Sequence, residues 1–348
     1  MFKKAHSIAI DGSYGEGGGQ ILRTACALSA ITGISCRVFN IRKNRRKPGL
    51  RLQHLIGIRN LKKLCNGNLE GDSLHSQEVF FRPGKVRSCT LNVKIETAGS
   101  ITLLLQTLLL PAFFAPGPVR IHFQGGATDT FYSPTMDYYR FVYLKILEKL
   151  GLKTDTEIIK RGFYPIGSAI VRVEVTPCKP KSWNCPDRGS LQAITIISGA
   201  SDTLKRARVA ERQAEAAEEL LMSKSAVPIE RKIEYYSTVS SGSQINIIGV
   251  FENSIVGSDG LGRPGTRAER VGKEVALRFV NEVNSMACLD RFASDQILPY
   301  VYLARGNSTL SVSGVSEHAK TNMWVVEQFL DRSSKVYEGC SNTMISIV

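Results

Sequence analysis

His318 is the side chain in this sequence best placed to act as a nucleophile. It stands in the polar run SEHAKTN, residues 316–322, where a predicted strand gives way to a predicted helix. A histidine at the start of a helix is accessible to substrate, and its neutral imidazole can attack a phosphoryl group. An ordinary histidine in the first turn of a helix is the alternative, which position alone leaves open.

A glycine-rich stretch near the N-terminus is a second candidate for chemistry. The run DGSYGEGGGQ, residues 11–20, joins a predicted strand to a predicted helix. This arrangement points backbone N–H groups at an anion, although the spacing matches neither the P-loop nor the Rossmann fingerprint. A tight structural turn is the alternative. Glu16 inside the turn favours a phosphate site, because a carboxylate beside bound phosphates is a natural ligand for Mg²⁺.

A basic loop follows, and it ends at a histidine. The run IRKNRRKPGLRLQH, residues 41–54, carries six cationic side chains within ten residues, just ahead of a predicted helix. Arginine binds a terminal phosphate through two parallel hydrogen bonds, so we expect a phosphate contact here rather than a solvated loop. His54 is expected to contact substrate. His6 and His122 lie in predicted strands and are expected to be structural, and His75 lies in a polar loop.

The excess of basic residues points to a polyanionic partner. Lys and Arg together number 45 and Asp and Glu 31, which gives a formal net charge of +14 over 348 residues. Because Lys and Arg neutralise phosphates and release counterions, this charge favours nucleic acid over a surplus of solvated lysine. Apolar residues at 43% and charged residues at 22% are typical of an ordinary globular protein.

Cysteine spacing and apolar segments bear on the cellular compartment. The eight cysteines contain no C-x-x-C pair and mostly sit beside apolar residues, a pattern that predicts buried free thiols in a reducing compartment. The most apolar run, residues 101–115, is shorter than the roughly 20 residues of a bilayer span and contains Gln106 and Pro111. We therefore expect a buried helix, no membrane partner, and a cytoplasmic protein, or a nuclear one in a eukaryote.

Three stretches share one order of elements, in which a strand and an apolar helix precede a strand, a polar loop and an amphipathic helix. The predicted elements are strand 6–11, helix 20 onward, strand 37–41 and helix 50–64; strand 90–95, helix 100–114, strand 119–123 and helix 134–150; and helix 295–303, strand 309–312 and a helix opening near residue 318. Strands 78–81, 169–175 and 344–348 would close the units. This pattern predicts an α/β (α+β) core of three repeated units, each a sheet plus two helices.

One segment breaks this pattern and predicts a smaller inserted α/β domain. Between residues 184 and 284 the order is strand 191–197, charged helix 205–223, two strands and helix 267–284. The predicted organisation is therefore units one and two over residues 1–183, the inserted domain over 184–284, and unit three over 285–348. The role of the inserted domain stays open, with guiding of RNA or binding of a partner as hypotheses.

Together these segments resemble the RNA 3′-terminal phosphate cyclase family. The matching runs are DGSYGEGGGQILR (11–23), IRKNRRKPGLRLQH (41–54), SQEVFFRPG (76–84), TAGSITLLLQTLLLP (97–111), RGFYP (161–165), FASDQILP (292–299) and EHAKTN (317–322). They span almost the whole chain in the family's order, and the family's repeated α/β units with one inserted domain agree with the architecture predicted above. One motif departs: Gly167, Ser168 and Ala169 stand where the family commonly has glycines, and these small residues are expected to preserve close backbone approach.

The resemblance implies a three-step reaction that uses ATP and Mg²⁺ or Mn²⁺. A histidine attacks the α-phosphorus of ATP, releasing pyrophosphate and leaving AMP on the imidazole. The AMP passes to an RNA 3′-terminal phosphate, and the neighbouring 2′-OH then displaces it to form a 2′,3′-cyclic phosphate. Adenylylation turns an inert phosphomonoester into an anhydride with a good leaving group.

The resemblance also assigns roles by position. His318 matches the nucleophile, Glu16 the metal ligand, and Gln106 an ATP contact. The nucleotide-binding segment matches Phe292, Ala293, Ser294, Asp295 and Gln296. Phe292 is expected to stack on adenine opposite Pro134. The groups expected to bind phosphates of ATP or RNA are Arg23, Arg42, Arg45, Gln53 and His54.

Two other functions fit parts of the pattern. A related ribosome-biogenesis protein would keep the fold and bind RNA without the adenylylation chemistry; the presence of His318 and of the nucleotide-site residues favours the enzyme. A small-molecule transferase built on similar repeated units, such as an enolpyruvyl transferase, would not need a nucleophilic histidine.

Overall fold

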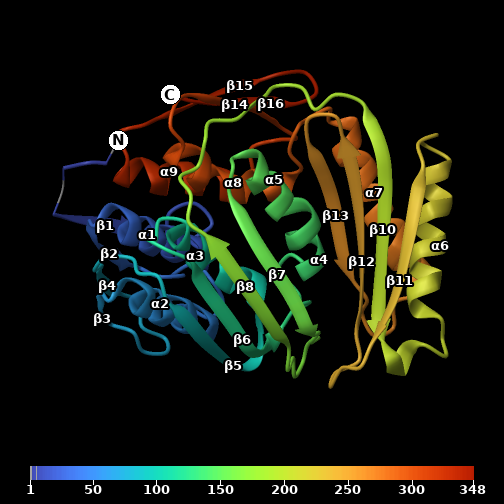
Figure 1. The fold of residues 1–348 in the computed structure, drawn as a ribbon, viewed down its shortest axis with the longest axis horizontal. Coiled ribbons are helices and arrows are strands. Elements are labelled where there is room, and N and C mark those ends of the chain that lie inside the picture. The colour runs from blue at the N-terminus through green and yellow to red at the C-terminus, as the bar shows by residue number, and fades with distance from the viewer. Residues whose placement is uncertain (1, 5) are drawn as a thin grey trace.

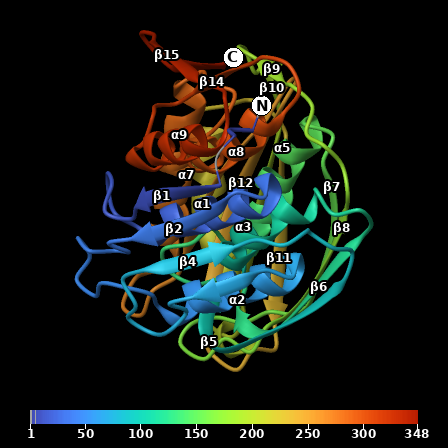
Figure 2. The same cartoon turned by 90° about the vertical axis from the view of Figure 1, so that its left-hand side faces the viewer.

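The computed structural model describes residues 2–4 and 6–348, and the strands in these ranges form four four-stranded sheets. Figures 1 and 2 show three of the sheets arranged around a group of central helices, and the fourth beside them with two helices of its own. The mixed α/β fold with repeated sheet-and-helix units is confirmed. The three predicted units and the predicted inserted domain each contain most of one sheet, although residues 184–185, predicted within the inserted domain, pair into the sheet of the third unit.

The first unit contains the glycine-rich turn and the basic loop. Its elements are β1 (Ser7–Asp11), α1 (Gly19–Thr32), β2 (Ser35–Phe39), α2 (Leu52–Cys65), β3 (Asn68–Glu70) and β4 (Val79–Arg82). The sheet order is β1-β2-β4-β3, with β1 and β2 parallel. Successive side chains of these strands point to opposite faces, so Cys36, Val38 and Phe81 are buried against α1 and α2. The short strands therefore form a sheet with one buried face and one face toward solvent.

The second unit repeats this arrangement with longer strands. Its elements are β5 (Thr90–Ser100), α3 (Ile101–Ala112), β6 (Val119–Ala127), α4 (Met136–Tyr138), η1 (Tyr139–Tyr143), α5 (Leu144–Lys149), β7 (Lys153–Lys160) and β8 (Ile170–Thr176). The sheet order is β5-β6-β8-β7. The predicted helix over 134–150 is present from Met136, although its residues 139–143 have π-helical geometry, and β7 was not predicted.

The third unit carries the candidate nucleophile. Its elements are α8 (Arg291–Leu303), β14 (Ser308–Val312), α9 (Glu317–Phe329), β15 (Ser334–Glu338) and β16 (Thr343–Ile347), and the short β9 (Asn184–Cys185) completes the sheet in the order β15-β16-β14-β9. Helix α1 packs against α2, α3 and α9, and α9 packs against α8. The central helices therefore bring the ends of all three units together.

The remaining sheet has a hydrophobic core of its own. Its elements are β10 (Leu191–Ser201), the 3₁₀ turn η2 (Asp202–Leu204), α6 (Val209–Met222), β11 (Ile229–Tyr236), β12 (Ser243–Phe251), β13 (Ile255–Leu261) and α7 (Ala268–Asn284). Helices α6 and α7 lie side by side over the sheet (Figure 1), and their apolar faces enclose Ile196, Ile247 and Phe279. Three strands follow α6, one more than the sequence predicted.

A buried ionic network joins this sheet to the second unit. The guanidinium of Arg161 lies 3.3 Å from a carboxylate oxygen of Asp129 and 2.6 Å from one of Asp137, and the three side chains are almost fully buried. Gln244 of β12 donates to Asp137 at 2.9 Å, and the guanidinium carbon of Arg161 lies 4.5 Å from the ring centroid of Tyr236. The network is fully partnered, as burial of charge requires.

The structure bears on the predictions about the cysteines and about the apolar segments. All eight cysteines are free thiols, and five are buried, as their apolar neighbours indicated. Within residues 2–4 and 6–348, no helix is both long and apolar enough to cross a bilayer. The apolar run over 101–115 forms the buried helix α3.

Replacement of Arg161 tests how strongly the network holds the two parts together. An Arg161→Met variant leaves two buried carboxylates without their cation, so we expect the free energy of unfolding to fall by about 3–5 kcal/mol. The matched control is Arg120→Met, which removes an exposed pair with Glu174 and should cost below about 1 kcal/mol. Urea unfolding followed by circular dichroism measures both; equal losses would contradict the assignment.

Candidate active site

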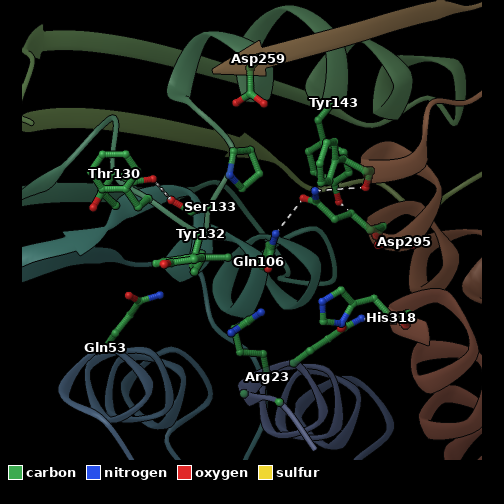
Figure 3. Close-up of a pocket in the computed structure, with 18 of the residues that line it drawn as sticks. Arg23, Gln53, Gln106, Thr130, Tyr132, Ser133, Tyr143, Asp259, Asp295 and His318 are labelled. Atoms are coloured by element: carbon green, nitrogen blue, oxygen red, sulfur yellow. Dashed lines mark hydrogen bonds between the residues drawn. The ribbon is translucent and has the colours of Figure 1, made fainter. Parts of the chain in front are cut away.

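A pocket of about 1110 Å³ opens among α1, α2, α3, α8, α9 and the inserted sheet. Figure 3 shows side chains from these elements converging on it. Twelve of the fourteen predicted site residues line this pocket: Glu16, Arg23, Arg42, Arg45, Gln53, His54, Gln106, Pro134, Phe292, Asp295, Gln296 and His318. The other two, Ala293 and Ser294, have buried side chains in α8 and do not line it.

His318 lies in the first turn of α9, with its imidazole facing the cavity (Figure 3). Ser316 caps the helix by accepting the backbone N–H of Ala319 at 3.0 Å, and the amide of Gln20 donates to the carbonyl of His318 at 3.1 Å. Partial burial, together with the cationic side chains of Arg23 and others nearby, lowers the pKa of His318 below its usual 6.5, although Glu16 opposes this effect. The imidazole is therefore neutral at neutral pH, as a nucleophile must be.

The glycine-rich turn is docked directly on α9. Gly15 has φ of +56°, and a Cβ atom there would lie 2.8 Å from Oγ1 of Thr321. The left-handed backbone and the close approach both call for glycine. The ring of Tyr14 stacks on that of Trp324 at a centroid distance of 4.1 Å. These contacts fix the position of the turn relative to His318.

Glu16 faces both the basic loop and the nucleophile. Its Oε2 lies 2.9 Å from Nη2 of Arg45 and 3.5 Å from Nε2 of His318. The described residues contain no cluster of three or more His, Cys, Asp or Glu side chains able to hold a metal. A divalent ion at Glu16 would therefore take one carboxylate from the protein and complete its shell with substrate phosphates and water, which is a common mode for Mg²⁺.

Arg23 brings a poorly solvated positive charge to the floor of the pocket. Burial lowers the pKa of its guanidinium to about 10, and the described part of the chain places no carboxylate within 4.0 Å of it. A partly buried guanidinium left without a protein counter-ion is well suited to a phosphate. Figure 3 shows Arg23 and His318 projecting into the same part of the cavity.

His54 lies beside these cations as a neutral side chain. Burial and the charges of Arg23, Arg42 and Arg51 lower the pKa of His54 to about 3. Its Nδ1 accepts the backbone N–H of Arg51 at 3.1 Å, so the ring proton sits on Nε2 and is available to an acceptor. The ring packs on the start of α1: a Cβ at Gly19 would lie 2.1 Å from His54 Nε2. Glycine at position 19 is thus needed for His54 to reach the pocket.

Another part of the pocket offers an exposed ring and amides. The side chain of Phe292 is 46% exposed, although the residue begins a helix whose neighbours are buried. Asp290 caps this helix by accepting the backbone N–H groups of Phe292 and Ala293 at 3.0 and 2.9 Å. Gln106 donates to the side chain of Gln296 at 2.8 Å. An aromatic face beside amide donors and acceptors can receive a nucleobase.

Several residues that line the pocket were not predicted. Asp259, Arg263, Arg270 and Arg278 come from the inserted sheet and its helix α7, and Phe131 and Tyr132 come from the loop that precedes α4. No role was predicted for the arginines of α7. No local motif marks these positions, since they reach the pocket only through packing of the inserted sheet against the second unit.

The fold and the pocket define a mixed α/β protein that presents a neutral histidine to a cavity lined by several arginines. The family model described as RNA 3′-terminal phosphate cyclase matches residues 14–336. Proteins named RNA 3′-terminal phosphate cyclase are 43% identical in Pyrococcus furiosus, over 95% of this chain and 96% of that one, and 41% identical in Methanopyrus kandleri, over 94% and 95%. The chain belongs to the RNA 3′-terminal phosphate cyclase family.

A solved structure, EPSP synthase from Acinetobacter baumannii, aligns at 10% identity with a TM-score of 0.32. The alignment covers 99% of this chain and 65% of that chain. A likeness this low carries no argument about function.

The carboxyl of Asp295 makes the stability of this site depend on pH. Burial raises its pKa from 3.8 to about 7, although Ser316 donates to it. The folded protein therefore keeps a proton on Asp295 at pH values where the unfolded chain has released it, and this stabilises the folded state. The stabilisation is lost as pH rises through about 7. Between about pH 6 and about pH 8, wild type should lose about 1 kcal/mol more unfolding free energy than Asp295→Asn.

The comparison needs an exposed carboxyl as its control. Asp155 lies on the solvent face of β7, and Asp155→Asn should leave the pH dependence of wild type unchanged. Urea unfolding at both pH values gives the differences. Parallel curves for wild type and Asp295→Asn would show that burial does not raise the pKa of Asp295 in this way.

Proposed function

We propose that this chain is an ATP-dependent RNA 3′-terminal phosphate cyclase that works through AMP bound covalently to His318. The observation that supports this most directly is the pairing of a neutral, accessible imidazole with an unpaired guanidinium, that of Arg23, in one cavity. Family membership supports the same reaction, because the relatives carry that name.

In the first step the lone pair of the His318 imidazole attacks the α-phosphorus of ATP. The bond from that phosphorus to the bridging oxygen breaks, and pyrophosphate leaves with the electron pair. The depressed pKa of His318 keeps the lone pair free at neutral pH, and Arg23 is placed to meet the charge that develops on the phosphoryl oxygens. Glu16 would hold Mg²⁺ or Mn²⁺, which would neutralise the phosphates.

In the second step an oxygen of the RNA 3′-phosphate attacks the phosphorus of the bound AMP and releases His318. In the third step the adjacent 2′-OH attacks the RNA phosphorus, loses its proton, and displaces AMP. Arg42, Arg45 and His54 line the side of the pocket that this second phosphate would occupy. The Nε2–H of His54 can donate to a phosphate oxygen without adding charge.

The base of ATP is assigned to the part of the pocket that Phe292 lines. Phe292 is exposed there and Pro134 lines the same cavity, so the two would enclose an adenine ring. Stacking of one base on an aromatic side chain is worth about 1–3 kcal/mol. The amides of Gln106 and Gln296 line the same cavity and can act as donors and acceptors.

Labelling with ATP tests the covalent step. Wild type incubated with Mg²⁺ and ATP labelled at the α-phosphate should acquire an acid-labile label, since a phosphorus–nitrogen bond hydrolyses in acid. His318→Asn should acquire none. The matched control is His75→Asn, because His75 is an exposed loop histidine and asparagine tolerates its φ of +66°.

Chasing the labelled protein with RNA tests the later steps. A 3′-phosphorylated oligoribonucleotide should remove the label and yield a cyclic phosphate, whereas a 3′-hydroxyl oligoribonucleotide should not. A folded wild type that binds ATP but never takes the label would be a non-catalytic RNA-binding relative. Removal of the label by small phosphorylated metabolites instead of RNA would indicate a small-molecule transferase.

A further inference from the structure

Tyr132 is displayed to solvent more completely than any other large apolar side chain in the described part of the chain. It is 99% exposed, and the next in order, Met222, is 68% exposed. Yet Tyr132 lies on the lining of the pocket, not on an outer surface. An aromatic ring held open inside a binding cavity lacks the packing that normally accompanies a tyrosine, and a ligand can supply it.

The backbone that presents Tyr132 is strained and firmly held. Its φ is +64°, in the left-handed region that non-glycine residues seldom occupy. The loop is closed by Ser133, whose hydroxyl donates to the carbonyl of Thr130 at 2.9 Å. Downstream, the backbone N–H of Thr135 donates to Asp259 at 2.6 Å. The exposed ring is therefore carried by a loop whose backbone is held by hydrogen bonds close to Tyr132.

A cation lies against the ring of the preceding residue, Phe131. The guanidinium carbon of Arg263, just past the end of β13, lies 5.2 Å from the ring centroid of Phe131, the residue before Tyr132. Both residues line the same cavity as Tyr132. An aromatic face next to a basic side chain is the combination that single-stranded nucleic acids require, because bases stack on the ring and backbone phosphates meet the charge.

The location of Tyr132 separates it from the predicted adenine site. In Figure 3, Tyr132 and Gln53 project into one side of the cavity and His318 into the other, with Gln106 between them. Adenine is assigned to Phe292, which stands on α8 with Asp295, and Figure 3 shows Asp295 on the same side as His318. A second nucleotide whose phosphate reaches His318 would enter past Gln53 and meet the ring of Tyr132.

We infer that Tyr132 is the stacking platform for the 3′-terminal nucleobase of a single-stranded RNA, with Arg263 meeting the phosphate on its 5′ side. This inference rests on the proposed function and adds to it how the RNA end is held. Every base has a π-face, so the platform accepts any terminal base. It favours an unpaired terminal base, because such a base can turn toward the ring without breaking a base pair.

Fluorescence of the terminal base tests the platform without relying on catalysis. The probe is a 3′-phosphorylated oligoribonucleotide with 2-aminopurine as its last base, whose emission falls on stacking. Wild type should quench it on binding. Tyr132→Ala should bind it about 5- to 150-fold more weakly, the range for loss of one stacked base, and should not quench at saturation. Tyr132→Phe should behave as wild type.

Two controls separate stacking on Tyr132 from other effects. Tyr337 on β15 is exposed and does not line the pocket, so Tyr337→Ala should leave binding and quenching unchanged. Labelling by ATP should be equal in wild type and Tyr132→Ala. A fall in ATP labelling that matches the fall in RNA affinity would overturn the inference and assign Tyr132 to ATP. The inference would also be overturned if Tyr132→Ala quenched the probe as strongly as wild type does.

Failure of the proposed function gives a different pattern. Quenching of the probe by wild type but not by Tyr132→Ala, with no labelling of wild type by ATP, would contradict the catalytic proposal and support the platform. A wild type that is labelled by ATP but does not bind the 3′-phosphorylated probe would overturn the platform and leave the first catalytic step standing.

Discussion

The glycine-rich turn with α1 and the helix α9 meet although almost the whole chain separates them. Thr24 donates to Asn322 at 2.8 Å, and Asn322 donates in turn to the carbonyl of Asp295 in α8. Since Arg23 and Glu16 come from one side of this contact and His318 from the other, the site exists only when the ends of the chain are docked. A contact of this sequence separation is costly in loop entropy, which the buried helix faces must offset.

The charge distribution in the pocket follows from that docking. The charges of Arg23, Arg42 and Arg51 help to keep His54 neutral, and those of Arg23, Arg45 and Arg291 help to keep His318 neutral. Among the residues described, Glu16 is the carboxylate that approaches both an arginine of this group and His318. The cavity thus keeps a positive potential in a partly dry environment, where interaction with phosphate is stronger than in water.

Local sequence was sufficient for most of the elements that carry the site. The apolar period of α1, α2 and α9 and the glycines at positions 15 and 19 are local signals. Twelve of the residues assigned from the resemblance line one cavity in the structure. Strand β7 was missed because it is half-exposed and mostly polar. Helix α6 begins at Val209 instead of residue 205, because Arg208 adopts a left-handed conformation ahead of it. No local motif singled out Tyr132, because the exposure of its ring in the pocket depends on how the loop lies in the folded chain.

The inserted sheet is part of the site's framework and not an appendage to it. Asp290 caps α8 and also accepts the hydroxyl of Tyr138 at 2.6 Å and the backbone N–H of Gly257, in β13, at 3.0 Å. One buried carboxylate thereby joins the helix that carries Phe292, the second unit and the inserted sheet. Because a buried carboxylate that loses a donor pays its full desolvation cost, a shift of the inserted sheet would disturb the start of α8. The start of α8, where Phe292 stands, is therefore held by contacts with both the second unit and the inserted sheet.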